Sequence, residues 1–120
     1  MYKTLTFLKR KRGMSLEEFR AYYETHHRRI GEQVLTRARR YMRRYVAPLA
    51  DGQPEADFDV ITEVWFADRA DYERQMAEIN VPDIIAMIVE DEEKLFDRSH
   101  YRLMHVDEVE SDIPAGAGAA

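Results

Sequence analysis

The order in which strand-type and helix-type segments follow one another is the feature of this sequence that most restricts its fold. Residues 2–9 are rich in β-branched and aromatic side chains, which indicates a strand. The following segment repeats apolar side chains at helical spacing, namely Leu16, Phe19, Tyr23, Ile30 and Val34. Ser15 and Glu18 have the spacing of a capping box, so we predict a long helix that begins there and ends near Leu35.

The rest of the chain predicts three further strands and two helical segments. Residues 38–47 and 58–66 alternate as strands do, on either side of a loop at 49–57. Asp68 caps a helix that stops at Asn80, residues 83–96 are helical, and residues 100–109 form the last strand. The order β-α-β-β-α-β, with one extra helix, is the pattern of the α+β ferredoxin-like fold. We therefore expect a four-stranded antiparallel sheet with its helices on one face.

Length and composition favour one domain inside the cell. The chain has 120 residues, so we assign residues 1–110 to a single domain and the Gly- and Ala-rich residues 111–120 to a flexible tail. Cysteine is absent, which excludes disulfides and thiolate chemistry. The N-terminus is unlike a signal peptide, and no apolar run approaches the ~20 residues that span a bilayer. We expect a cytoplasmic protein with no membrane partner.

Alternation along the third strand predicts a dimer. Phe58, Val60, Thr62, Val64 and Phe66 are expected to point to one face of the sheet, and Ile61 and Trp65 to the other. Large apolar groups on both faces leave one face without cover from the helices. A second copy of the chain has the same need, so we predict a homodimer whose sheets pack together.

Charge is distributed unevenly. Residues 1–50 carry 13 Lys/Arg and 4 Asp/Glu, a balance of +9, whereas residues 51–120 carry 5 and 19, a balance of -14. Arginines among Tyr41 and Tyr45 could follow a nucleic-acid backbone, but the overall acidity argues against a nucleic-acid partner. The alternative is that they face solvent or pair with the acidic half. The acidic run at 90–93 is interpreted as the solvated start of a helix.

Two neighbouring histidines are the candidates for proton-transfer chemistry. On a helical wheel, His26 and His27 flank the apolar stripe on its two sides, so the spacing alone barely distinguishes them. Glu24 and His27 have the Glu-x-x-His spacing of a metal site, but that motif works in pairs and no second copy exists, so we expect no metal. Phosphate loops, nucleophile elbows and dinucleotide fingerprints are absent from the sequence, and we expect no cofactor.

Aromatic side chains are the candidates for a ligand pocket between the first helix and the sheet. They are Tyr23, Tyr41, Tyr45, Trp65 and Tyr101. The simpler interpretation is that they form ordinary core. If they do line a pocket, it suits a small hydrophobic or aromatic ligand.

Several segments in a fixed order resemble one known family. The matching residues are Phe7-Leu8-Lys9-Arg10-Lys11, Gly13-Met14-Ser15, Glu17-Glu18-Phe19, Tyr22, His27, Phe58-Asp59, Trp65-Phe66, Tyr72, Asp91-Glu92, Phe96-Asp97 and Val106-Asp107-Glu108. Together they resemble the EthD family of the dimeric α+β barrel superfamily, over roughly residues 2–110. This resemblance implies a ferredoxin-like homodimer and selects His27 over His26. After that histidine the family often has a small residue and a proline, whereas this chain has Arg28-Arg29-Ile30.

The resemblance leads to a functional hypothesis. The superfamily contains cofactor-free monooxygenases, cyclases, an isomerase and haem-degrading enzymes, and fold does not choose among them. We expect a small-molecule enzyme or accessory protein, of the cofactor-free oxidoreductase, isomerase or lyase type. His27 would be the general acid/base and Tyr23 its hydrogen-bonding neighbour. Expected substrate-binding residues are Tyr41, Arg39, Arg43 and Trp65. The alternative is a non-catalytic dimeric module that presents its basic surface to a partner protein, and haem binding is a third hypothesis.

Overall fold

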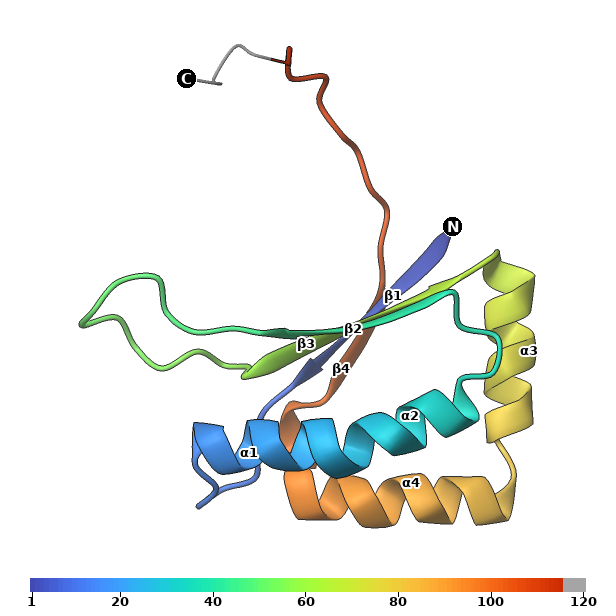
Figure 1. The fold of residues 1–120 in the computed structure, drawn as a ribbon, viewed down its shortest axis with the longest axis horizontal. Helices are drawn as coiled ribbons and strands as arrows, with labels where there is room; N and C mark the ends of the chain where they lie inside the picture. Colours follow the sequence, from blue (N-terminus) through green and yellow to red (C-terminus); the bar gives the residue numbers. More distant parts are fainter. Residues whose placement is uncertain (116–120) are drawn as a thin grey trace.

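A four-stranded antiparallel sheet forms one layer of the molecule (Figure 1). The computed structural model describes residues 1–115. The strands are β1 (Tyr2–Leu8), β2 (Arg40–Tyr45), β3 (Val60–Phe66) and β4 (Arg102–His105), in the spatial order β2-β3-β1-β4. This order places the two central strands β1 and β3 side by side, and it confirms the predicted ferredoxin-like α+β topology.

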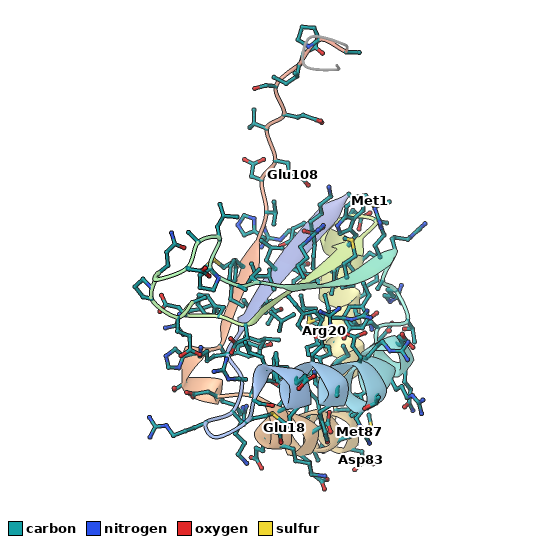
Figure 2. The ribbon with its side chains drawn as sticks, turned by 60° about the vertical axis from the view of Figure 1, so that its left-hand side comes forward. Met1, Glu18, Arg20, Asp83, Met87 and Glu108 are labelled. Carbon is teal, nitrogen blue, oxygen red and sulfur yellow. The ribbon has the colours of Figure 1, made fainter. Side chains whose placement is uncertain are left out.

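The helices form a second layer on one side of the sheet (Figure 2). They are α1 (Leu16–Tyr22), α2 (Arg28–Val34), α3 (Arg69–Ile79) and α4 (Pro82–Leu95), with a short 3₁₀ turn, η2 (Arg98–His100), before β4. Both hydrogen bonds of the predicted capping box form, from Glu18 N–H to Ser15 Oγ and from Ser15 N–H to Glu18 Oε1. The segment that joins α1 to α2, η1 (Tyr23–His27), is a wider π-helical turn. The long first helix was thus predicted correctly, apart from this turn.

An aromatic cluster holds the two layers together. The buried side chains are Leu8, Phe19, Tyr23, Val60, Leu95 and Phe96. The Phe19 ring lies edge-on to Phe96, at a centroid distance of 5.9 Å, and to Tyr23 at 6.3 Å. Fully burying one such side chain stabilises the fold by about 1.5–3 kcal/mol. The cluster therefore fixes α1, η1 and the end of α4 against β1 and β3.

Alternate residues of β3 face opposite sides of the sheet, as predicted. Residues 60, 62, 64 and 66 are buried beneath the helices, and residues 61, 63 and 65 are half-buried on the other side. Phe58 departs from the prediction, because its ring lies 5.2 Å from Phe7. Phe7 pairs with Ile61 and shares the uncovered face. The alternation ends before Val60, because Asp59 is buried beside it and its carboxylate accepts hydrogen bonds from Arg10.

The last strand is shorter than predicted. It ends at His105, and the following residues leave the sheet as an extended segment (Figure 1). Through Ala115 this segment forms no helix or strand, and the remainder of the predicted tail, residues 116–120, lies outside the described residues. No helix in residues 1–115 is long and apolar enough to cross a membrane.

Ion pairs join the basic half of the sequence to the acidic half. Arg10 binds Asp59 at 2.9 Å and Glu55 at 2.6 Å, across the ends of β1 and β3. Arg37 binds Asp71 at 3.0 Å and Glu78 at 2.6 Å, and so ties the start of β2 to α3. Much of the basic charge is therefore neutralised within the chain, as the second interpretation of the charge pattern expected.

Candidate functional site

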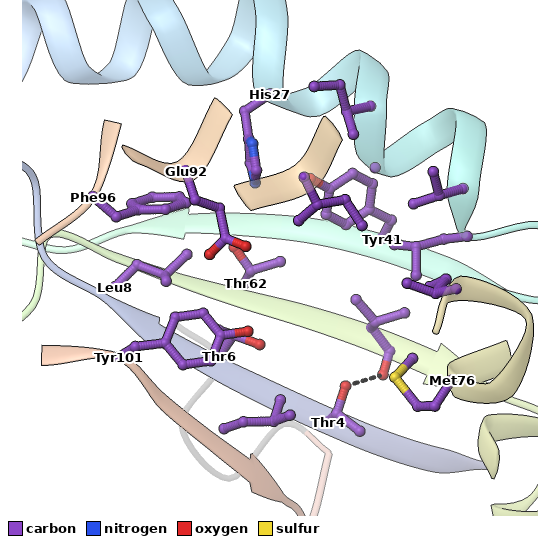
Figure 3. Close-up of a pocket in the computed structure, with 18 of the residues that line it drawn as sticks. Thr4, Thr6, Leu8, His27, Tyr41, Thr62, Met76, Glu92, Phe96 and Tyr101 are labelled. Carbon is purple, nitrogen blue, oxygen red and sulfur yellow. Dashed lines mark hydrogen bonds between the residues drawn. The ribbon is translucent and has the colours of Figure 1, made fainter. Parts of the chain in front are cut away.

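A cavity of about 260 Å³ lies between the helices and the inner face of the sheet (Figure 3). Most of its wall is apolar, contributed by Leu8, Ile30, Val34, Leu35, Val64, Phe66, Met76, Ile79, Ile88, Phe96 and Leu103. The side chains that bring polar atoms are Thr4, Thr6, Tyr23, His27, Tyr41, Thr62, Tyr72, Glu92 and Tyr101. An apolar chamber with a few polar groups is the usual form of a small-molecule site.

The His27 imidazole lies at the wall of this cavity in a fixed orientation. Its Nδ1 lies 2.8 Å from Asp91 Oδ2, and Tyr22 Oη donates a hydrogen bond of 2.5 Å to the other oxygen of Asp91. The imidazole ring stands edge-on between Tyr23 and Phe96, at centroid distances of 5.0 and 5.1 Å. Within residues 1–115, the Nε2 atom of His27 has no hydrogen-bond partner, and it is not fully buried. Nε2 is therefore the ring nitrogen that remains available to a ligand.

The protonation state of His27 follows from the same contacts. Burial lowers the pKa of His27 below its ordinary value, and the hydrogen bond and charge of Asp91 only partly oppose this effect. The imidazole is therefore neutral at pH 7. A carboxylate accepts hydrogen bonds, so Nδ1 carries the proton and Nε2 presents a lone pair to the cavity.

The π-helical turn positions the residues of the first helix toward the cavity. Residues 23–27 adopt it, and both Tyr23 and His27 line the cavity wall. Single π turns inside α-helices are often found at functional sites, because the extra residue redirects the side chains that follow. His26 points elsewhere: it is exposed, and its ring stacks on Tyr22 at 4.7 Å. Sequence spacing could not separate the two histidines, whereas the structure places only His27 at the cavity.

Two tyrosines and a threonine form a polar line along one wall. Tyr23 Oη lies 2.7 Å from Thr62 Oγ1 and 3.3 Å from Tyr41 Oη. Burial raises the pKa of both phenols, so both are neutral. A Cβ on Gly31 would lie 2.8 Å from the Tyr41 ring, so the absence of a side chain at position 31 lets this phenol sit against the helix.

Asp91 and Glu92 are site residues that the sequence interpretation missed. The acidic run at 90–93 lies in the last turns of α4 and not at a helix start, and Asp91 and Glu92 are buried. Their signal was the spacing, because they continue the apolar stripe of Ile84, Ile88 and Leu95 at intervals of three and four residues. Charge alone had suggested a solvated surface.

The other predicted site residues divide between cavity, core and opposite face. Tyr41 and Tyr101 line the cavity, whereas Tyr45 belongs to the core and donates a hydrogen bond of 2.6 Å to Glu24. Neither Trp65 nor Arg39 lines this cavity. Trp65 lies on the uncovered face of β3, against the Lys3 ammonium at 3.8 Å, and Arg39 is exposed outside the cavity wall.

Arg43 and Glu24 bind each other and do not line the cavity. The Arg43 guanidinium donates two hydrogen bonds to the Glu24 carboxylate, of 2.7 and 3.0 Å, and does not line the cavity. Glu24 and His27 are thus held by separate partners, Arg43 and Asp91. Within residues 1–115 no group of three or more His, Asp or Glu side chains is arranged to hold a metal ion.

Comparisons with known proteins agree with this fold. An EthD family protein from Bacillus halodurans C-125 superposes with a TM-score of 0.63 at 16% identity, over 91% of this chain and 100% of that one. HapK from Hahella chejuensis gives 0.58 at 13% identity, over 97% and 100%. A Dabb family protein with a ferredoxin-like fold from Mesorhizobium loti gives 0.53 at 15% identity, over 92% and 97%. At these identities the likeness shows the fold alone.

Family membership comes from the sequence match. No curated protein matches this sequence significantly. The family model described as the EthD domain, in contrast, matches residues 11–99, a span that runs from before the first helix into η2. Because that span is well over half of the chain, the protein belongs to the EthD family.

Proposed function

We propose that this protein binds a small, mostly apolar ligand in the cavity, and that His27 exchanges a proton with it as a general acid/base. The observation that carries this proposal is the state of the imidazole. Asp91 holds Nδ1, and Nε2 has no partner within the described residues while it borders an apolar chamber. A base in such a place is shielded from bulk water and oriented before the ligand arrives, and both properties favour proton transfer.

Tyr23 and Tyr41 are the proposed hydrogen-bonding neighbours. Their phenols form one chain with Thr62, and Tyr41 is the less buried of the two. A neutral phenol can donate a hydrogen bond to a ligand oxygen. Neither Arg39 nor Arg43 reaches the cavity, so stabilisation of a negative charge by arginine forms no part of the proposal.

A homodimer through the uncovered face of the sheet is the second part of the proposal. That face carries Leu5, Phe7, Ile61, Trp65 and Met104, interspersed with charged side chains. The support is a physical argument. Apolar side chains exposed on a sheet are stabilised when another surface covers them, and a two-fold partner has the same apolar surface to bury. Light scattering at micromolar concentration should give twice the chain mass, and a monomer would contradict the dimer.

The test of the proposed chemistry follows the His27 ring by NMR. Aromatic and lactone ligands should shift its signals, and ligands that contact Nε2 should also change its pKa. His26→Ala is the matched control, because His26 is its exposed sequence neighbour and should leave ligand binding unchanged. His27→Ala should abolish proton transfer. A panel of such ligands that leaves the His27 signals unmoved would contradict the proposal.

The competing hypothesis is a non-catalytic module that binds an acidic partner. It draws on the basic half of the chain, and the pairing of Arg10, Arg37 and Arg43 with carboxylates of the same chain counts against it. Salt-dependent co-purification with another protein, together with an unaffected His27→Ala variant in cells, would favour this alternative.

A further inference from the structure

A second ionisable group borders the cavity without any partner. Glu92 extends from the last turns of α4, and its residue is 9% exposed. Its carboxyl group makes no hydrogen bond and no ion pair with any of residues 1–115. Figure 3 shows the carboxyl directed from the helix layer into the cavity, toward the sheet. Buried carboxyl groups are normally paired, so an unpaired one at a cavity wall indicates a position where a ligand binds.

The neighbours of Glu92 leave its carboxyl facing the cavity. Asp91, next to it on α4, is occupied by His27 and Tyr22. From the segment after α4, the Arg98 guanidinium lies 4.0 Å from Glu93 and forms no hydrogen bond with Glu92. Tyr101 lines the same wall, and burial together with the charge of Glu92 raises its pKa to about 12. The phenols of the cavity wall, the Arg98 cation and the Asp91 charge are therefore the groups that act on this carboxyl.

Building on the proposed function, we propose that Glu92 is the acid partner of the base His27, and that the ligand is a neutral molecule with an enolisable carbonyl group. His27 and Glu92 come from different elements, η1 and α4, and border one chamber. An apolar ketone or lactone fits the wall, and its oxygen would accept the proton of the Glu92 carboxyl. A carboxylate ligand fits the step less well, because Glu92 becomes a carboxylate when it gives up its proton and would then face a like charge.

The proposed step moves one proton from carbon to oxygen. His27 Nε2 removes a proton from the carbon next to the carbonyl, and the electron pair of that C–H bond forms the C=C bond. The π pair of the C=O bond moves to oxygen, which takes the proton of Glu92. The product is an enol beside an imidazolium and a carboxylate. Return of a proton from the imidazolium to the same or a conjugated carbon, and of the enol proton to Glu92, regenerates the enzyme and completes exchange or isomerisation without an oxidant.

Burial acts on the two groups in complementary directions. It raises the pKa of Glu92, which the Arg98 charge opposes and the Asp91 charge supports, and it lowers the pKa of His27. The two values therefore move toward each other. As a result, a larger share of the molecules carries a protonated carboxyl and a neutral imidazole at the same time, which is the state that the step requires.

Hydrogen–deuterium exchange of a simple ketone tests this assignment. The probe is 2-tetralone, a bicyclic aromatic ketone, incubated with the full-length protein in D₂O. Proton NMR follows the loss of the signals next to its carbonyl, and shifts of the His27 signals report binding. We expect Glu92→Gln to lower the exchange rate by about 100-fold or more while binding is retained. Glu93→Gln is the matched control, because Glu93 is the exposed neighbour on α4 and should leave the rate unchanged.

Two further readouts separate chemistry from structure. The exchange rate of the wild type should fall as the pH rises through the pKa of Glu92, and the Glu92→Gln variant should not show this fall. Glu92→Asp keeps a carboxyl group but places it farther from the ligand. This variant should show the same fall in rate with rising pH, from a lower maximum rate. A Glu92→Gln variant that binds tetralone and exchanges its protons at the wild-type rate would overturn the role of Glu92.

Failure of the proposed function gives a different result. If aromatic and lactone ligands leave the His27 signals unmoved, the cavity is not a ligand site and both proposals fall. If such ligands bind but 2-tetralone does not, or binds without faster exchange than in buffer, the ketone class and the acid role of Glu92 are wrong while ligand binding stands.

Discussion

The two faces of the sheet contrast sharply, although the same strands build both. On the inner face, Val60, Thr62, Val64 and Phe66 are buried beneath helices. On the outer face, the side chains between them are only half-buried, and Trp65 is flanked by the cations of Lys3 and Arg40. A period of two residues along a strand is enough to place one side chain at the cavity side of the sheet and its neighbour on the uncovered face.

Packing differs between the faces in a way that bears on function. Between the inner face and the helices, the aromatic cluster around Phe19 fills one part of the space, and the cavity occupies another part. The outer face gathers apolar side chains in one layer with no second layer over them within residues 1–115. We therefore expect ligand binding and proton transfer at the inner face, and association of two subunits through the outer face.

The largest expected effect comes from removing a ring that packs between the helices and the inner face. Phe19 is fully buried, so Phe19→Ala should lower the free energy of unfolding by about 3–5 kcal/mol, measured by denaturant titration. Phe7→Ala, the matched truncation on the outer face, should cost less in a monomer. A loss for Phe7→Ala that grows with protein concentration would show that a second copy covers that ring.

A charge on the outer face should separate the proposed subunits. Ile61 pairs with Phe7 at the centre of this face, so Ile61→Asp would place a carboxylate within the interface. We expect the dimer to weaken by about 2 kcal/mol or more, close to 30-fold, with the far-ultraviolet circular dichroism unchanged. Sedimentation velocity measures the mass. A wild-type mass for this variant would assign the interface to another surface.

On the inner face, replacing the partner of His27 should alter its titration. Asp91→Asn removes a charge that raises the pKa of His27, so this pKa should fall further below its ordinary value. The pKa of Tyr22, now about 12, should also decrease, because Asp91 contributes to raising it. The loss of a charged hydrogen-bond partner should cost about 1–3 kcal/mol of unfolding free energy. NMR titration of His27 measures the first effect, and an unchanged pKa would contradict the contact.

The smallest effect is the pH dependence that Glu92 adds to stability. Its pKa is raised in the folded protein, so its contribution is complete below the ordinary glutamate pKa and is lost as the pH rises through the folded value. The Glu92→Gln variant has no carboxyl group to ionise at this position, so it does not lose this stability as the pH rises. Its free energy of unfolding, relative to the wild type, should therefore increase as the pH is raised from 4 to 7. A constant difference over that range would mean that the carboxyl is not desolvated.

Sequence patterns predicted the layers of this molecule better than its chemistry. The capping box at Ser15 and the alternation of 60–66 depend on neighbouring residues only, and both were predicted correctly. Asp91 was missed because its role depends on a contact with His27, 64 residues earlier in the chain. Trp65 was assigned to the pocket from its residue type, although its position in the alternation already directed it to the outer face.

The π turn at Tyr23–His27 gives the first helix an unusual tolerance of length. A π turn holds one residue more than the α turn it replaces, so deleting one residue there would restore regular winding, at about 100° per residue, and leave everything beyond it in phase with the sheet. Ile30, Gly31 and Val34 would stay on the chamber wall, and only the residues of the turn itself would change direction. A deletion at this place would thus spare most of the chamber.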